Sequence, residues 1–268
     1  MTLSRLSTFL FLVALGLGCV TTGPGGKTSL VIIPTSQEVA LGHAMAKEIS
    51  TSEKELPDPQ WQAYLSGVGG RLVAVCDRKD IEYHFTVIES DQINAFATPG
   101  GYVYFYTGLL NMMDNEGELA AVMAHELSHV VARHGAKRLQ AAMGASMAYQ
   151  LVTGDTKSET FKAAVGIGMN LLFAGYSRDA EREADDFAVT YMIRAGYDPN
   201  AMETMFDKLA ASGSQSNAFE KLVSSHPETE ERIRNTKAAV AGQKPLPANL
   251  RLDRDKYQEM KKRLPPAK

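Results

Sequence analysis

The sequence predicts an α+β fold that is mostly helical and contains a small β-sheet. Two segments are expected to form strands, residues 83–88 (YHFTVI) and 102–106 (YVYFY), because β-branched and aromatic side chains dominate them. Most other segments carry apolar residues at helical spacing, and the run from Glu118 to Arg133 is apolar nearly all round. A helix of that kind is expected at the centre of the core.

The first half of the chain is expected to alternate helices, strands and turn formers. The helices follow from apolar spacing, and the bridge between the strands follows from its Pro and Gly residues. In order, we expect a helix from Ser36 through Ile49, a helix at 60–75, a strand at 83–88, a turn-rich bridge at 94–101 and a strand at 102–106.

The second half is expected to be helical. Asn115 and Glu118 have the capping-box spacing, and Gly135 is expected to end the helix that they start, with Arg133 and His134 in its last turn. The other expected segments are a short helix at 108–113, helices at 140–152, 161–174, 177–195 and 199–211, a flexible loop at 212–217, a helix from about 228 to 239, and a charged surface tail at 243–268.

The N-terminus has the features of an export signal. An apolar run from Leu6 to Leu17 follows Arg5 and is too short to span a bilayer comfortably. The run ends at Cys19 after a small residue, which is typical of lipoprotein cleavage sites, although an ordinary secretory signal is the alternative. We expect a signal peptide at 1–18, a lipid anchor on Cys19 with a linker at 19–35, and export to the periplasm, with the outer membrane favoured over the inner one.

Composition excludes one large class of partners. The formal net charge is -3, and no stripe of Lys and Arg is interleaved with aromatic residues, so nucleic acid is not expected to bind. Only two cysteines are present, and if Cys19 is lipidated, Cys76 has no partner for a disulfide. Cys76 is therefore expected to be a buried, unreactive thiol. His43 and His84 lack a neighbouring ligand pattern and are not expected to bind metal.

The central helix carries an HExxH sequence at residues 125–129. On a helix, His125 and His129 project from one face and can bind a single metal ion, with Glu126 beside it as a base for a metal-bound water. A chance match on a charged surface helix is the alternative. The apolar residues around the motif count against it, because two buried histidines and a glutamate need a partner such as a metal. The motif predicts a zinc hydrolase.

A catalytic zinc needs a third protein ligand. The metzincin pattern is excluded, because Gly135 stands where its third histidine would be. Glu181 and Asp185 share a helix face further along the chain, so Glu181 can bind the metal while Asp185 orients a ligand histidine, and Glu183 points elsewhere. A charged helix face explains these carboxylates equally well.

Four ordered motifs between about Ser36 and Val240 resemble the HtpX and CAAX-prenyl-protease type of zinc metallopeptidases. The chain differs from that family at Ser128, where the family usually has Gly. It is also expected to lack the spanning helices of the membrane-embedded members, which makes it similar to a soluble periplasmic lipoprotein branch. The motifs are NAFAxPGG at 94–101, ELAAVMAHELSHV at 118–130, SRxxExxAD at 177–185, and His226-Pro227 with Arg232-Ile233.

The resemblance implies a zincin-type domain at 36–242 with one zinc per chain and a small sheet beside the HExxH helix. Glu181 would be the third zinc ligand. Asp185 and Arg232 would lie behind the ligands and contact them without binding the metal. By the same resemblance His226 would stabilise the oxyanion. A separate expectation comes from the residues: His226 follows the loop at 212–217 and imidazole is a good zinc ligand, so in a resting enzyme it would fill the water position. A zinc-bound water with His226 out of range would contradict that latency. The strand with Gly101, Tyr102, Val103 and Tyr104 would be a sheet edge that binds substrate.

The function expected from these features is endoproteolysis of extended segments in misfolded or unfolded cell-envelope proteins. Glu126 would deprotonate the attacking water. The alternative is a zinc-stabilised periplasmic chaperone or assembly factor without proteolytic activity. The expected partners of the protein are unfolded polypeptides and a membrane, which it would contact through the lipid anchor.

Overall fold

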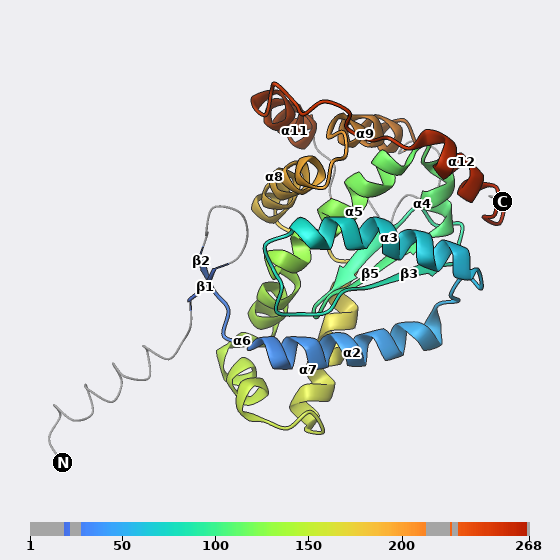
Figure 1. Ribbon diagram of the computed structural model, residues 1–268. Helices are drawn as coiled ribbons and strands as arrows, with labels where there is room; N and C mark the ends of the chain where they lie inside the picture. Colours follow the sequence, from blue (N-terminus) through green and yellow to red (C-terminus); the bar gives the residue numbers. More distant parts are fainter. Residues whose placement is uncertain (1–18, 22–27, 213–225, 227–229, 267–268) are drawn as a thin grey trace, which may run out of the picture.

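The computed structural model describes residues 19–21, 28–212, 226 and 230–266. It confirms a mostly helical α+β fold with a small sheet (Figure 1). The elements are β1 (Cys19–Thr21), β2 (Thr28–Leu30), α2 (Thr35–Ser52), α3 (Pro59–Val75), β3 (His84–Ile88), β4 (Ala95–Thr98), β5 (Tyr102–Tyr106), α4 (Thr107–Met112), α5 (Glu116–Val131), α6 (His134–Thr153), α7 (Glu159–Leu171), α8 (Arg178–Arg194), α9 (Asn200–Ser212), α11 (Glu230–Gly242) and α12 (Arg254–Lys261).

The three-stranded sheet has the order β3-β5-β4, with β3 parallel and β4 antiparallel to β5. The expectation that residues 102–106 form a sheet edge is therefore wrong, because β5 is the central strand. Residues 94–101 were expected as a bridge but contain β4. Their Ala, Phe and Thr residues show no clear alternation, and pairing with β5 supplies the strand.

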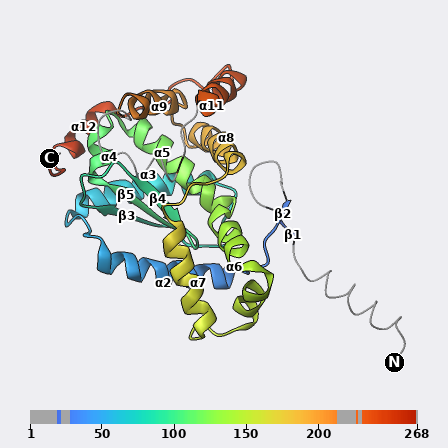
Figure 2. The ribbon, with the colours of Figure 1, turned by 180° about the vertical axis from the view of Figure 1, so that it is seen from behind.

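Helices cover both faces of the sheet. Val103 and Phe105 point into the main core with residues of α3 and α5, whereas Tyr104 and Tyr106 point to the opposite face, where α2 and α7 pack (Figures 1 and 2). The alternating side chains of a strand produce this division. Gly69 lets α3 approach the sheet closely, since a Cβ there would lie 2.3 Å from the Phe85 ring.

Helix α5 runs through the middle of the molecule and begins as expected. The Asn115 side chain accepts a hydrogen bond from the Glu118 backbone N–H at 2.9 Å. It ends at Val131 rather than at Gly135, because Arg133 adopts a left-handed conformation with φ 56°. His134 therefore starts α6 instead of closing α5.

A buried ion network holds Arg133 in this conformation. Its guanidinium donates to the Glu38 carboxylate at 2.7 Å and to the Ile33 carbonyl at 2.6 Å. Arg78 binds the same carboxylate through two hydrogen bonds of 2.9 Å and also donates to the Val130 carbonyl. The network joins α2 to the end of α5, so the interior rather than local propensity sets the turn after the HExxH motif.

Both flanks of the domain differ from expectation. Val31 and Ile33, placed in the linker, are buried in a core cluster. The described part of the expected surface tail contains α12, whose Tyr257 is fully buried and donates to the Leu110 carbonyl at 2.7 Å. Trp61 donates from Nε1 to the Met260 carbonyl at 2.9 Å, so the tail is packed against α3 and is not a free surface segment.

The remaining helices lie within a few residues of their expected positions. The expected helix at 140–152 is the later part of α6, which bends at Gly144. The signal peptide at 1–18 and residues 213–217 of the expected loop lie outside the described residues. Among the described residues, no helix has the length and apolar character needed to cross a bilayer.

Candidate metal centre

Helices α5 and α8 bring together the residues that the motifs singled out. His125 and His129 lie one turn apart on the buried face of α5 that packs along α8, and Glu181 lies in the first turn of α8. Their ligand atoms, together with one of His226, all lie within 4.8 Å of one another, and all four residues are buried. Burial would raise the pKa of Glu181, but His226 and the other histidines hold it far below its ordinary value.

His226 comes into this group from the segment before α11. Its Nδ1 lies 3.0 Å from Oε1 of Glu181 and 3.3 Å from Nε2 of His125. Its Nε2 lies 3.5 Å from Oε1 of Glu126, the expected base. The imidazole thus borders both the ligand group and the base, which is compatible with an oxyanion contact and with a fourth ligand position.

Asp185 orients His125. Its Oδ1 accepts from Nδ1 of His125 at 2.9 Å, which leaves Nε2 of His125 with a lone pair aimed at the group. Arg232 donates two hydrogen bonds of 2.8 Å to the same carboxylate and lies 2.8 Å from Oε2 of Glu181. Burial acts to raise the pKa of Asp185, but the hydrogen bonds from Arg232 and His125 outweigh it and keep the carboxylate ionised.

A second chain of hydrogen bonds orients His129, and the sequence did not reveal it. Nδ1 of His129 lies 2.8 Å from Nδ1 of His134, and Nε2 of His134 lies 3.1 Å from Oε2 of Glu183. Burial lowers the pKa of His134 despite Glu183, so the ring is neutral. Its single proton faces the carboxylate, His134 Nδ1 accepts from His129 Nδ1–H, and Nε2 of His129 is left with its lone pair.

Glu183 lies outside the ligand group, as expected, yet it contributes through His134. Only the break in the helix at Arg133 turns His134 back toward His129. The Tyr176 ring stacks on the His129 ring; the two rings are nearly parallel, and their centroids are 4.0 Å apart. A histidine five positions after a ligand histidine is the one signal in the sequence that could have suggested this contact.

The donor set fits a metal cation. Nε2 of His125 and Nε2 of His129 are 3.1 Å apart, and with both lone pairs facing each other they need a proton or a metal ion between them. Burial lowers the pKa of His125, but Asp185 and Glu181 raise it to about 10, so these carboxylates favour one positive charge at the site. Two imidazoles and a carboxylate are typical ligands of a catalytic zinc.

Comparison with known proteins agrees with this geometry. The sequence model of peptidase family M48 matches residues 59–240, a range that begins with α3, ends within α11 and includes every residue of the ligand group. The chain belongs to peptidase family M48.

The relatives that the chain matches include bacterial proteins and a mitochondrial protein. The chain is 30% identical over 231 residues to the beta-barrel assembly-enhancing protease of Yersinia pestis, covering 83% of this chain and 48% of the relative. It is 35% identical over 173 residues to the mitochondrial metalloendopeptidase OMA1 of Schizosaccharomyces pombe, covering 64% of this chain and 50% of the relative. The metalloprotease LoiP of Escherichia coli is 31% identical over 157 residues, covering 57% of this chain and 60% of the relative. The chain spans about half the length of the first two.

Membership of M48 implies a divalent metal, and the residues that would hold it are those of the ligand group. The expected substrate residues Gly101, Tyr102, Val103 and Tyr104 are at or in the central strand β5 and not at a free edge. The strand beside α5 is β4, and Ala97 of β4 lines the same small cavity as His129.

Proposed function

We propose that this chain is a zinc-dependent endopeptidase that cleaves extended segments of misfolded or unfolded cell-envelope proteins. The observation that carries the proposal is the buried group of His125, His129 and Glu181 with Glu126 beside it in an M48 domain. Bound zinc would supply Lewis acidity toward water and the peptide carbonyl. The names of two relatives, a beta-barrel assembly-enhancing protease and a metalloendopeptidase, support the envelope setting and the reaction class.

The chain's own residues would perform the proton transfers. The Glu126 carboxylate is 2% exposed and belongs to the residue next to His125, so it can take a proton from the attacking water and deliver it to the leaving amine. Nε2 of His226, near that carboxylate, would donate to the oxygen that becomes negative as the carbonyl is attacked. Asp185 and Arg232 would hold His125 and Glu181 in place.

The purified chain with zinc is expected to fragment a reduced, unfolded protein and to leave the same protein intact when it is native and disulfide-bonded. Gel electrophoresis and mass spectrometry of the products would follow the reaction. The alternative function, a zinc-stabilised chaperone or assembly factor, predicts that the unfolded protein is kept from aggregating without any new peptide termini. Removal of zinc by a chelator serves as the control, because it should stop cleavage.

Substrate is proposed to add to the outer edge of β4. The Tyr106 N–H donates to the Asn94 carbonyl at 3.0 Å, and alternation along the antiparallel pair then turns the backbone groups of Ala95 and Ala97 away from β5. Such groups can bind an extended peptide with little regard to its side chains.

Ala97→Pro is expected to raise the peptide KM by about three- to tenfold, because it removes one outward donor from β4 without removing a hydrogen bond to β5. Steady-state kinetics with a fluorogenic peptide would measure it. Ala97→Val is the matched control, since it adds bulk at the same position but keeps the N–H. Equal KM values for Ala97→Pro, Ala97→Val and the parent chain would argue against strand addition at β4.

We further propose that the protein is exported, lies in the periplasm and is anchored by a lipid on Cys19, with the outer membrane favoured. The support is the apolar run that ends at a small residue and Cys19. Cys19→Ser is expected to move the protein from the membrane fraction to the soluble fraction after cell lysis and centrifugation. Mass spectrometry that found an unmodified N-terminus at another residue would contradict the anchor.

A further inference from the structure

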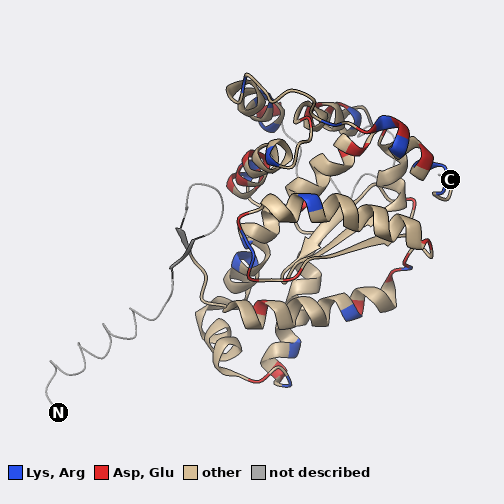
Figure 3. Cartoon of the chain, viewed as in Figure 1, with Lys and Arg blue, Asp and Glu red and all other residues tan. Residues whose placement is uncertain are grey.

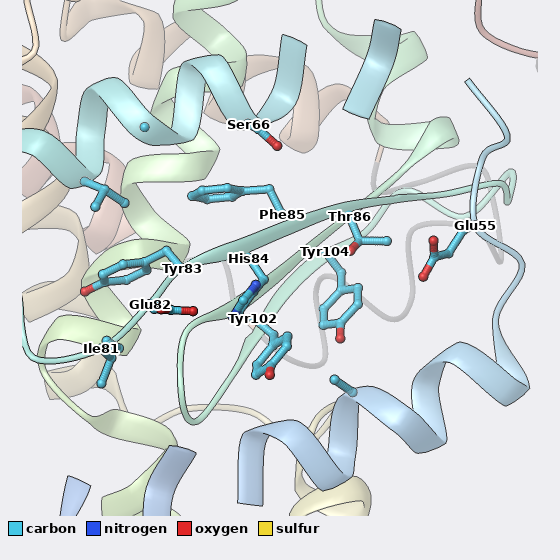
Figure 4. Close-up of a pocket in the computed structure, with 13 residues that line it drawn as sticks. Glu55, Ser66, Ile81, Glu82, Tyr83, His84, Phe85, Thr86, Tyr102 and Tyr104 are labelled. Atoms are coloured by element: carbon cyan, nitrogen blue, oxygen red, sulfur yellow. The ribbon is translucent and has the colours of Figure 1, made fainter. Parts of the chain in front are cut away.

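The sheet edge farthest from β4 borders an open cleft, which we call the β3 cleft. It has two adjoining parts, each of about 820 Å³, that share Ile81, Glu82, His84 and Tyr102. In the close-up, Tyr102, Tyr104 and His84 point from the sheet toward α2, while Phe85 points the other way, toward α3 (Figure 4). The cleft therefore surrounds the edge of β3, two strands away from the strand that borders the metal centre.

The amino-terminal part of β3 has backbone groups available for pairing. The His84 N–H donates to the Gly101 carbonyl at 2.9 Å, so His84 faces β5 and the backbone groups of Phe85 and Val87 face outward. The Val87 carbonyl accepts from the Leu56 N–H at 2.8 Å. In the part of the chain that the structure describes, no such partner is seen for the N–H and C=O of Phe85.

The charged side chains that line the β3 cleft are all acidic. Its lining contains the carboxylates of Glu55, Glu82 and Asp80 but no Lys or Arg. Asp80 is bound by Arg78, whereas neither Glu55 nor Glu82 forms an ion pair with any residue that the structure describes. Figure 3 shows Lys and Arg interspersed with Asp and Glu along α8, α9, α11 and α12.

Aromatic rings lie between the two unpaired carboxylates. Glu82 and Glu55 are at opposite ends of the view, with the rings of His84, Tyr102 and Tyr104 between them (Figure 4). His84 stacks on Tyr102 with ring centroids 4.5 Å apart. Burial and the Glu82 charge raise the pKa of Tyr102, so its ring stays a neutral phenol. Neutral aromatic rings and carboxylates together attract a cationic side chain.

The length of the cleft suits a short extended peptide. Its α2 wall runs from Ser36 to Ala46, which at about 1.5 Å per helical residue is about 15 Å. A strand rises about 3.3 Å per residue, so about five residues fill this length. Alternate side chains of such a strand would fall toward Tyr102 and Tyr104, and the others toward Phe85 and α3.

We infer that the β3 cleft binds an extended polypeptide segment that pairs with Phe85 and places Lys or Arg side chains among Tyr102, Tyr104, Glu55 and Glu82. The site is separate from the metal centre and does not depend on the proposed peptidase activity. A polypeptide held there would be tethered at the far edge of the sheet from β4.

The test uses the full chain carrying Glu126→Gln, so that a bound peptide is not cut, and the fluorescein-labelled hexapeptide Lys-Val-Lys-Val-Lys-Val. Fluorescence anisotropy is expected to show saturable binding of this peptide and at least fivefold weaker binding of Glu-Val-Glu-Val-Glu-Val. Adding Glu55→Gln and Glu82→Gln together should weaken binding of the lysine peptide by about fivefold, as expected for the loss of two ion pairs made by exposed carboxylates. Glu48→Gln is the matched control, because Glu48 is exposed on α2 outside the cleft and should leave the dissociation constant unchanged.

Amide hydrogen exchange of Phe85, followed by NMR, gives a second readout that does not depend on charge. Its amide should exchange at least tenfold more slowly at saturating lysine peptide, because strand pairing occupies it. An unprotected Phe85 amide, equal binding of the acidic peptide, or equal binding after the Glu55 and Glu82 substitutions would each overturn the inference. Cleavage assays report on the metal centre independently, so failure here leaves the proposed peptidase function open.

Discussion

Glu126→Gln is expected to lower kcat by about 10²- to 10⁴-fold while zinc stays bound. General acid–base catalysis contributes a factor of this size, and a carboxamide cannot accept a proton from the attacking water. Glu126 is not one of the four residues whose ligand atoms converge, so the metal group remains intact. Gln has nearly the same shape, so the packing of α5 around this 2%-exposed side chain is preserved.

Two measurements on the same preparation test this expectation. Single-turnover cleavage of an unfolded protein gives the rate, and metal analysis gives the zinc stoichiometry, expected at one per chain. Glu159→Gln is the control, because Glu159 is 87% exposed at the start of α7 and should change neither value. Normal cleavage by Glu126→Gln would show that Glu126 is not the base. If the variant lost both zinc and activity, Glu126 would have a structural role instead.

His134→Ala is expected to weaken zinc binding by about 10- to 100-fold, the usual effect of removing a partner behind a ligand histidine. Without His134, Nδ1 of His129 loses the acceptor 2.8 Å away that keeps its proton on the far side from the metal. Glu183→Gln should act in the same direction but more weakly, because it changes the orientation of His134 without removing it. Competition with a fluorescent zinc chelator would measure both dissociation constants.

The double variant distinguishes one hydrogen-bond chain from two separate contributions. If Glu183 acts through His134, adding Glu183→Gln to His134→Ala should weaken zinc binding no further. Asp179→Asn is the control on the same helix, since its side chain is 89% exposed. A folded His134→Ala variant with unchanged zinc affinity would show that His129 is held by Tyr176 stacking and the backbone alone.

Most helices and the three metal-ligand candidates could be read from the amino-acid order, because their signals are local. Apolar spacing locates α3 and α8 within about two residues. The i, i+4 spacing of His125 and His129 places both on one helix face whatever the rest of the fold does. Glu181 was less secure from spacing alone, because its distance from the HExxH motif is set by the packing of α8 on α5; the family resemblance favoured it.

Contacts between distant residues decided the rest. Tyr102–Tyr106 has the composition of a strand, but only pairing on both sides by β3 and β4 makes it central. Tyr257 belongs to a highly charged segment and is nevertheless buried, because Trp61 and Leu110 offer a surface and an acceptor far away in the sequence. His134 reaches His129 because Glu38, about 95 residues earlier, holds Arg133 in a left-handed turn. Strand order, tail packing and the orientation of His129 depend on contacts with residues far away in the sequence. The local spacing of apolar residues cannot predict such contacts.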